Sequence, residues 1–256
     1  MIDYSECATL APKGNSPSDF QLIPSNKVSS YFKSSNSTNS PQPMWRQNTT
    51  IIHYGPGVDV NTTVCSLTFN IPEDIGPPVL FYYRLTNFYQ NHRRYVKSFD
   101  SNQLKGGAIS STSIAKGSCT PLLLAPDGKP YYPCGLIANS VFNDTFSSPI
   151  RVGNADNKTY PMTNNGIAWA SDRALYGPTK YTVDQIAVPP NWVLRWPNGT
   201  YTTDNPPPNL QQDEGFQVWM RTAGLPTFSK LALRNDNETM AGGMYQVDIG
   251  LSMHHR

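Results

Sequence analysis

The chain contains few charged residues and no block of charge of one sign. Charged side chains make up 15% of its 256 residues, and 20 basic against 18 acidic side chains leave a formal net charge of only +2. A domain that neutralises many phosphates is usually far more basic, so the composition argues against a dedicated nucleic-acid binder. Asn, Ser, Thr, Pro and Gly are abundant instead, a profile that is typical of secreted or lumenal proteins.

Residues that would carry catalysis are also scarce. The chain has four histidines, two of them near its end, and it lacks the GxSxG, HExxH, P-loop, GxGxxG and EF-hand patterns. We therefore predict that it is not an enzyme and that it binds no metal or cofactor. Two alternatives stay open. One is a secreted glycosidase that uses Asp213 or Glu214, because such enzymes need only two carboxylates brought together in space. The other is a secreted carbohydrate-binding β-sandwich with exposed tryptophans.

No targeting or membrane-spanning segment is visible in the sequence. The start, MIDYSECATL, lacks the basic residues and the apolar run of a signal peptide. The longest apolar run, residues 78–83, is far shorter than the roughly 18 residues that a transmembrane helix needs. A lumenal composition without a targeting segment predicts an excised ectodomain. Either a signal peptide has been cleaved from it, or the membrane helices that flank it are not part of this sequence.

The four cysteines are widely spaced and none forms a CxxC pair, which argues against a zinc site. An even number of such cysteines is typical of two disulfides formed in an oxidising compartment. Four cysteines allow three connectivities. The pairing that joins sequence neighbours, Cys7 with Cys65 and Cys119 with Cys134, is favoured, but the others stay open, as do four buried free thiols.

Seven N-x-[ST] sequons are present, about twice the number expected by chance for this composition. If the chain enters the secretory pathway, several of them should carry glycans and lie on the surface. The candidate asparagines are Asn36, Asn48, Asn61, Asn143, Asn157, Asn198 and Asn237.

Proline frequency predicts the fold class. The 23 prolines interrupt nearly every stretch long enough for a helix. We expect a mainly β, antiparallel, sandwich-like single domain over 1–256, with a few short helices, long irregular loops and two disulfides. Residues 13–50 are expected to form an exposed loop or arm, and 201–213 a second long connection. Strand-length segments with β-branched or aromatic residues are Val64–Ile71, Val79–Leu85, Val193–Trp196, Gly215–Met220 and Met244–Leu251.

The segment 81–98, FYYRLTNFYQNHRRYVKS, mixes aromatic and basic residues more densely than any other. Its first part continues the strand that begins at residue 79. Asn87 with Gln90 predicts a capped helix start, after which residues 88, 92, 95 and 99 would form an aromatic stripe facing the core. The exposed side would then carry the basic residues, a candidate partner interface because Arg is favoured at protein interfaces: Arg93, Arg94 and Lys97.

Residues 81–106, FYYRLTNFYQNHRRYVKSFDSNQLKG, resemble the hallmark segment of the accessory β-subunits of lipid flippases, which partner type IV P-type ATPases. Further similar blocks follow in family order from about residue 65 to residue 231: PCGLIANSVFNDTF, GIAWASDR, PPNWVLRW and VWMRTAGLPTFSKL. Four tryptophans lie in or beside these blocks, and we expect them to pack in the core: Trp169, Trp192, Trp196 and Trp219. The chain departs from the family pattern at Ala170, where a second aromatic is usual, and at 251–256, a tail that we expect to be disordered or foreign.

The resemblance implies a non-catalytic ectodomain between two membrane helices, on the lumenal or extracellular side of the endoplasmic reticulum, Golgi, endosome or plasma membrane. It implies that this ectodomain binds the exoplasmic loops of the ATPase and supports its folding, its exit from the endoplasmic reticulum and its transport cycle. It also implies a Cys119–Cys134 disulfide, a second one near the start of the chain, and glycans on Asn143 and Asn157.

Overall fold

A computed structural model describes residues 1–33, 41–153 and 157–251. The fold is mainly β, as predicted, and every pair of strands is antiparallel. The larger sheet has the order β1-β2-β3-β9-β6-β7, and β5 pairs with β9. Its strands are β1 (Gln21–Leu22), β2 (Met44–Gly55), β3 (Val58–Ile71), β5 (Thr145–Phe146), β6 (Ile150–Val152), β7 (Lys158–Thr159) and β9 (Gly243–Leu251).

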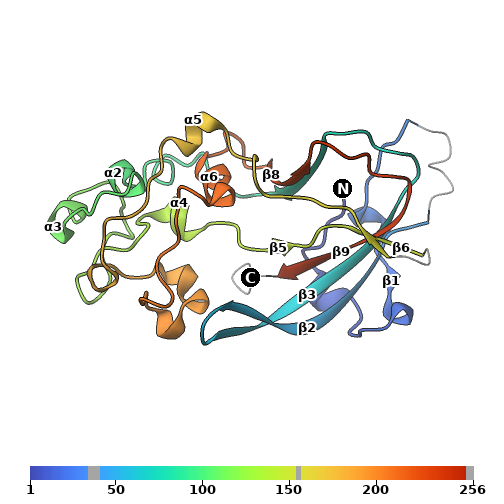
Figure 1. The fold of residues 1–256 in the computed structure, drawn as a ribbon, viewed down its shortest axis with the longest axis horizontal. Coiled ribbons are helices and arrows are strands. Elements are labelled where there is room, and N and C mark those ends of the chain that lie inside the picture. Colours follow the sequence, from blue (N-terminus) through green and yellow to red (C-terminus); the bar gives the residue numbers. More distant parts are fainter. Residues whose placement is uncertain (34–40, 154–156, 252–256) are drawn as a thin grey trace.

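A second, two-stranded sheet packs on the larger one. It consists of β4 (Val79–Leu85) and β8 (Phe228–Asn235), as Figure 1 shows. Phe81 of β4 contacts Phe146 of β5, with 5.0 Å between ring centroids. Two residues further along β4, Tyr83 stacks on Phe142 at 3.9 Å. Aromatic pairs of this kind stabilise by about 1 kcal/mol beyond the area they bury. The two sheets therefore form a sandwich-like layer pair.

Short helices gather at the end of the molecule opposite β1 and β6 (Figure 1). Long irregular connections join them, as the many prolines predict. The α-helices are α1 (Cys7–Leu10), which lies apart beside the large sheet, and α2 (Ser101–Leu104), α3 (Ser111–Ile114), α4 (Leu136–Asn139), α5 (Ala170–Arg173) and α6 (Glu214–Met220). The 3-10 helices are η1 (Pro17–Asp19), η2 (Ser25–Lys27), η4 (Val183–Gln185), η5 (Pro190–Arg195) and η6 (Pro197–Gly199).

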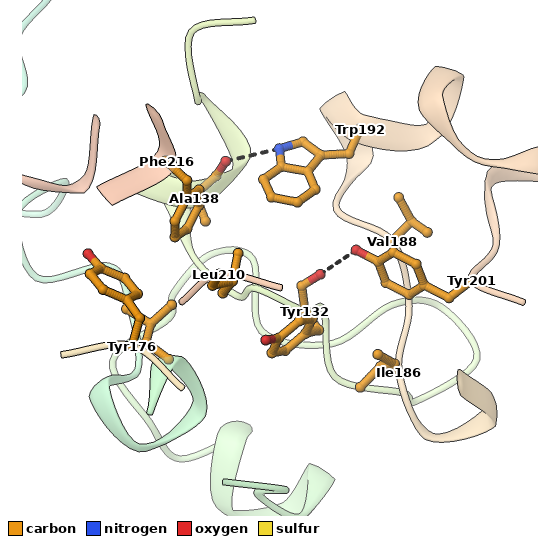
Figure 2. Packing of buried hydrophobic residues seen from close by; sticks show 10 residues of the cluster. Tyr132, Ala138, Tyr176, Ile186, Val188, Trp192, Tyr201, Leu210 and Phe216 are labelled. Atoms are coloured by element: carbon orange, nitrogen blue, oxygen red, sulfur yellow. Dashed lines mark hydrogen bonds between the residues drawn. The ribbon is translucent and has the colours of Figure 1, made fainter. Parts of the chain in front are cut away.

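The helical end has its own buried cluster, shown in Figure 2, which ties its irregular loops together. Trp192 donates from Nε1 to the carbonyl of Ala138 at 3.0 Å, and Tyr201 donates from its hydroxyl to the carbonyl of Tyr132 at 2.6 Å. These bonds satisfy polar atoms that would otherwise be costly to bury. Loops that carry little regular structure thus gain fixed positions from aromatic side chains with one polar end.

The β2–β3 hairpin connects the sheet end to the helical end (Figure 1). At its tip, Asn205 donates from Nδ2 to the carbonyl of Pro56 at 3.0 Å, and Arg195 lies over the ring of Tyr54 at 5.3 Å. Val58, the first residue of β3, is buried there. The hairpin tip is therefore fixed to η5 and to the loop that follows it.

Disulfides join Cys7 to Cys65 and Cys119 to Cys134, which is the pairing that the sequence favours. The first bridge attaches α1 to β3, and the second closes a 15-residue segment between α3 and α4. Closing a loop of this length stabilises a fold by about 3 kcal/mol in the chain-entropy description.

Two of the five predicted strands are helices instead. Residues 193–196 lie in or beside η5, which begins at Pro190 and turns so that Trp192 is buried. Residues 215–220 belong to α6, because Asp213 caps that helix by accepting a hydrogen bond from the backbone N–H of Phe216 at 2.9 Å. The other three segments lie in β3, β4 and β9. Residues 13–50, expected to be a loop or arm, contain η1, β1 and η2, and 44–50 lie in β2.

The helix predicted to begin at Asn87 is also absent. Asn87 adopts a φ of 57°, and the backbone N–H of Phe88 donates to the carbonyl of Pro226 at 3.0 Å. Gln90 is fully buried, and its Oε1 accepts from the backbone N–H of Ala223 at 2.8 Å instead of from the N–H of Asn87 that a capping box would require. A distant segment of chain thus takes the hydrogen bonds that a helix would have used, and 87–98 form successive turns.

Candidate partner-binding surface

The basic residues of the turn segment 87–97 point to solvent. Arg93, Arg94 and Lys97 are all exposed, and none of them forms a salt bridge with another residue in the described part of the chain. Three unneutralised cations within five positions give this surface a local positive charge that the near-neutral composition of the whole chain does not reveal.

The aromatic residues of the same segment mostly face inward, as predicted, although no helix places them. Phe88 contacts Trp219 edge-to-face at a centroid distance of 5.4 Å, and the hydroxyl of Tyr95 lies 2.8 Å from Oγ of Ser140. Phe99 packs in the same cluster. His92 is the exception, because it is exposed. The packed rings hold the segment in place, and the exposed cations are thus presented on a backbone with a defined course.

A second segment, 221–226, lies against the first. Asn91 donates from Nδ2 to the carbonyl of Gly224 at 2.9 Å. This bond adds to those that Phe88 and Gln90 make with the same segment. Next to the contact, two large side chains are mostly exposed: Tyr89 at 59% and Leu225 at 69%. Apolar groups so exposed beside unpaired cations are typical of a protein-binding surface.

Trp169 extends this surface. It is 63% exposed, which corrects the expectation that it packs in the core. The guanidinium of Arg221 lies over its ring at 3.9 Å and also pairs with Asp172 of α5 at 3.0 Å. We call the surface formed by these groups the basic-aromatic face; its members are Tyr89, Arg93, Arg94, Lys97, Trp169, Arg221 and Leu225.

Buried polar groups support the face from below. Lys230 of β8 is 7% exposed and donates from Nζ to the carbonyls of Val218, at 2.8 Å, and of Arg221. It thereby caps the end of α6, where free carbonyls carry partial negative charge. Burial lowers the pKa of Lys230 to about 8, and the neighbouring Arg221 acts in the same direction.

Glu214 and Asp213, the candidate acids of a glycosidase, have structural roles. Glu214 accepts from the backbone N–H of Ala168 at 2.9 Å and pairs with Arg173. Burial by itself would raise the pKa of Glu214, but the hydrogen bonds from Ala168 and Gly166 and the charge of Arg173 outweigh it and hold the pKa below its usual value. Asp213 caps α6. Glu214 therefore holds α5 and the residues before it against α6, and Asp213 stabilises the start of α6.

No sequon lies in the segments that build the basic-aromatic face. None occurs between residues 62 and 142, nor in 158–197 or 199–236, and these three ranges contain every residue of the face. Asn61, Asn157, Asn198 and Asn237 are exposed. Asn48 and Asn143 are half-buried, and Asn48 donates from Nδ2 to Oδ1 of Asn15 at 2.7 Å. Asn36 and residues 252–256 of the expected tail lie outside the described residues.

Comparison with known proteins shows the family to which the chain belongs. The chain belongs to the LEM3 (ligand-effect modulator 3) family, also called the CDC50 family, whose profile matches residues 1–254. It is 45% identical over 97% of its length to the phospholipid-transporting ATPase accessory subunit CDC50 of Chaetomium thermophilum, and 41% identical over 98% to the accessory subunit CRF1 of Saccharomyces cerevisiae. Cell cycle control protein 50A of Bos taurus is 39% identical over 75% of the chain.

The chain spans about three fifths of the length of the curated relatives that it matches: 61%, 59% and 55% for these three. The first two are named as accessory subunits of an ATPase, in agreement with the prediction that this chain is not an enzyme. Among the described helices, none has the length and apolar character needed to cross a bilayer.

Sequence reasoning identifies Arg93, Arg94 and Lys97 but misses the other part of the face. Trp169, Arg221 and Leu225 are distant from them along the chain and join them through buried hydrogen bonds at Gln90 and Lys230. One signal in the sequence indicates that 215–220 form a helix and not a strand. Phe216, Trp219 and Met220 have the i, i+3, i+4 spacing of a helix, and a helix there makes Asp213 a cap.

Proposed function

We propose that this chain is the exoplasmic domain of a non-catalytic accessory subunit of a phospholipid-transporting type IV P-type ATPase. In this function the domain binds exoplasmic loops of the ATPase and supports its folding, its exit from the endoplasmic reticulum and its transport cycle, at the endoplasmic reticulum, Golgi, endosome or plasma membrane. The observation that carries the proposal is that relatives matching 97–98% of the chain are named as accessory subunits of phospholipid-transporting ATPases.

The surface that we propose for the contact is the basic-aromatic face. It combines exposed, unpaired cations with exposed large apolar groups, and it lies on a backbone fixed by Gln90 and Lys230. Arg and aromatic residues are enriched in protein interfaces, where Arg side chains fork onto carboxylates and carbonyls. No sequon lies in the segments that build this face, including those of Asn143 and Asn157, whose glycans the family resemblance implies, so no native glycan is attached to these segments.

The two rival functions receive less support. The carboxylates of Asp213 and Glu214 are occupied by a helix cap and by an ion pair with backbone hydrogen bonds. A carbohydrate-stacking platform needs exposed aromatic faces, yet Trp45, Trp192 and Trp219 are buried. Trp196 is half-buried and stacks on Trp192, and one face of Trp169 is covered by Arg221.

Charge reversal on the face tests the proposal. We expect the double variant Arg93→Glu, Arg94→Glu to recover at least about tenfold less ATPase on co-purification from membranes, because like charges placed across an interface cost several kcal/mol. The matched control is Lys13→Glu, Lys158→Glu, which reverses two exposed cations beside the large sheet, where neither forms a salt bridge with a described residue.

Both variants should keep the thermal stability and the glycan pattern of the unaltered protein, since all four side chains are exposed. Equal recovery of the ATPase with Arg93→Glu, Arg94→Glu and with the control would refute the basic-aromatic face as the contact surface. Absence of any ATPase from the unaltered protein in its native membrane would refute the accessory function itself.

A further inference from the structure

The outer edge of β2 is open over five residues. β1 pairs only with Met44 and Trp45, and the N-terminal segment pairs only with Gln47, whose N–H donates to the carbonyl of Pro12 and whose carbonyl accepts from Gly14. Because backbone groups alternate in direction along a strand, the N–H and C=O groups of residues 49, 51 and 53 also point outward. Among the described residues, no strand pairs with them.

This edge has few of the features that usually prevent strands from pairing. Natural edges are commonly protected by Lys, by Pro, by bulges or by a covering element. Here the sequence over 48–54 is Asn-Thr-Thr-Ile-Ile-His-Tyr, with no Lys, Pro or carboxylate. Ile51, at its centre, is 53% exposed. The open stretch is about 17 Å long at the usual rise per residue, which is enough for another strand to pair.

A second copy of the chain is the strand partner that this edge fits. In an antiparallel pair related by a two-fold axis at Ile51, residue 49 of one copy would face residue 53 of the other. The two Ile51 side chains would then meet at the centre and bury their exposed apolar surface. The edge is therefore a site of self-association unless a group covers it.

Asn61 is placed to supply that group. It pairs with Ile51 across the β2–β3 ladder. Because the N–H and C=O of Ile51 point outward, the two backbones exchange no hydrogen bonds at this pair. Side chains in such pairs lie on the same face and close together, with Cα atoms about 4.5 Å apart. Asn61 is exposed, and with Thr62 and Thr63 it forms a sequon. The next pair on the same sheet face toward the hairpin tip is His53 and Asp59, which are also exposed. Nδ1 of His53 lies 2.5 Å from Oδ1 of Asp59.

We infer that an N-linked glycan on Asn61 covers Ile51 and the open edge of β2, and so prevents two copies from pairing through it. The inference rests on the exoplasmic location in the proposed function. In the modification, Nδ2 of Asn61 loses one proton and forms a bond to the first sugar of an oligosaccharide. The C–O bond between that sugar and its lipid-pyrophosphate donor breaks, and the lipid pyrophosphate leaves.

Substitutions at Thr63 test the inference in the protein made in a eukaryotic secretory host. Thr63→Ala removes the sequon but keeps Asn61, whereas the matched control Thr63→Ser keeps the sequon. We expect glycopeptide mass spectrometry to find Asn61 occupied in the unaltered protein and in Thr63→Ser. Light scattering should show the mass of single copies for these two and at least a doubled mass for Thr63→Ala. Adding Ile51→Lys to Thr63→Ala should restore single copies.

Enzymatic removal of glycans from the folded, unaltered protein gives a second comparison, which does not depend on the folding of Thr63→Ala. Treated unaltered protein should self-associate, and treated Ile51→Lys should not. An unoccupied Asn61, or single copies of Thr63→Ala and of the treated protein, would overturn the inference. If Asn157 or Asn237 carries a glycan while Asn61 does not, this inference alone fails. If no sequon carries a glycan, the exoplasmic location fails with it.

Discussion

Lys230 shows how a single buried cation determines the course of the chain around it. Its ammonium group forms no salt bridge with a described residue, and it is held by carbonyls at the end of α6. The group therefore joins β8 to the segment 221–226 that carries Leu225. A hydrogen bond to a charged group is worth roughly 1.5–3 kcal/mol, twice a neutral one, so this contact holds the basic-aromatic face in place.

The pH dependence of stability should report this buried lysine. Burial lowers the pKa of Lys230 from 10.5 to about 8. Between these values the unfolded chain binds a proton that the folded protein has released, so this group makes stability rise with pH. The rise between pH 7 and pH 9.5 should be about 2 kcal/mol. Urea unfolding of the unaltered protein and of Lys230→Met should therefore give stability curves that diverge by this amount.

The control for this measurement is Lys158→Met, at an exposed lysine of β7. Its curve should run parallel to that of the unaltered protein. Buried tyrosines such as Tyr132, whose pKa is raised to about 12 by burial, titrate in all three proteins and cancel in the comparison. Parallel curves for Lys230→Met as well would show that Lys230 keeps an ordinary pKa.

At the scale of elements, what the sequence predicts depends on how local the determining contacts are. β3, β4 and β9 are predictable because β-branched and aromatic residues within each segment suit a buried strand. The turns at 87–98 are not, because Phe88 and Gln90 bond to residues more than 130 positions away. The same holds for the basic-aromatic face, where Trp169 and Arg221 meet only after folding.

The β2–β3 hairpin depends on one such distant contact. Asn205, 8% exposed, bonds to the carbonyl of Pro56 at the hairpin tip. Asn205→Ala leaves this carbonyl without its partner, and we expect the free energy of opening the tip to fall by about 1 kcal/mol. Hydrogen exchange of residues 54–58 should then be about fivefold faster. The exposed neighbour Asp204 supplies the control Asp204→Ala.

Exchange over 63–71, in the middle of the large sheet, should stay unchanged in Asn205→Ala, because these residues pair with β9 independently of the tip. Unchanged exchange at the tip would show that the packing of Val58 and the contact of Tyr54 with Arg195 are sufficient to hold it. An increase throughout the sheet would show instead that the tip contact stabilises the whole hairpin.

At the scale of the whole molecule, the sequons and the basic-aromatic face belong to different segments of the chain. The four exposed sequon asparagines lie in β3, beside β7, in η6 and after β8. The face is built from segments 87–97, 169–173 and 221–226. A glycan is a large hydrated group that keeps other proteins away. If the face is the contact with the ATPase, a glycan placed on it should abolish binding, although the molecule carries glycans elsewhere.

A new sequon introduced at position 94 tests whether the face is the contact with the ATPase. The double variant Arg94→Asn, Val96→Thr creates an N-x-T sequence at an exposed position, and Val96→Thr preserves the shape of a half-buried side chain. We expect this variant to be glycosylated at residue 94, to fold normally and to recover no ATPase on co-purification. The control variant Arg94→Gln, Val96→Thr loses the same charge but creates no sequon. Comparing the two variants therefore distinguishes the effect of the glycan's bulk from the effect of losing one cation.

The control variant should keep most of its binding, because the other two unpaired cations, Arg93 and Lys97, remain and one rim charge contributes about 1 kcal/mol or less. Full recovery of the ATPase by the protein with a glycan at residue 94 would mean that the partner contacts another side of the molecule. Among the described residues, the segments of α2 and α3, which also contain no sequon, would become the next region to test in the same way.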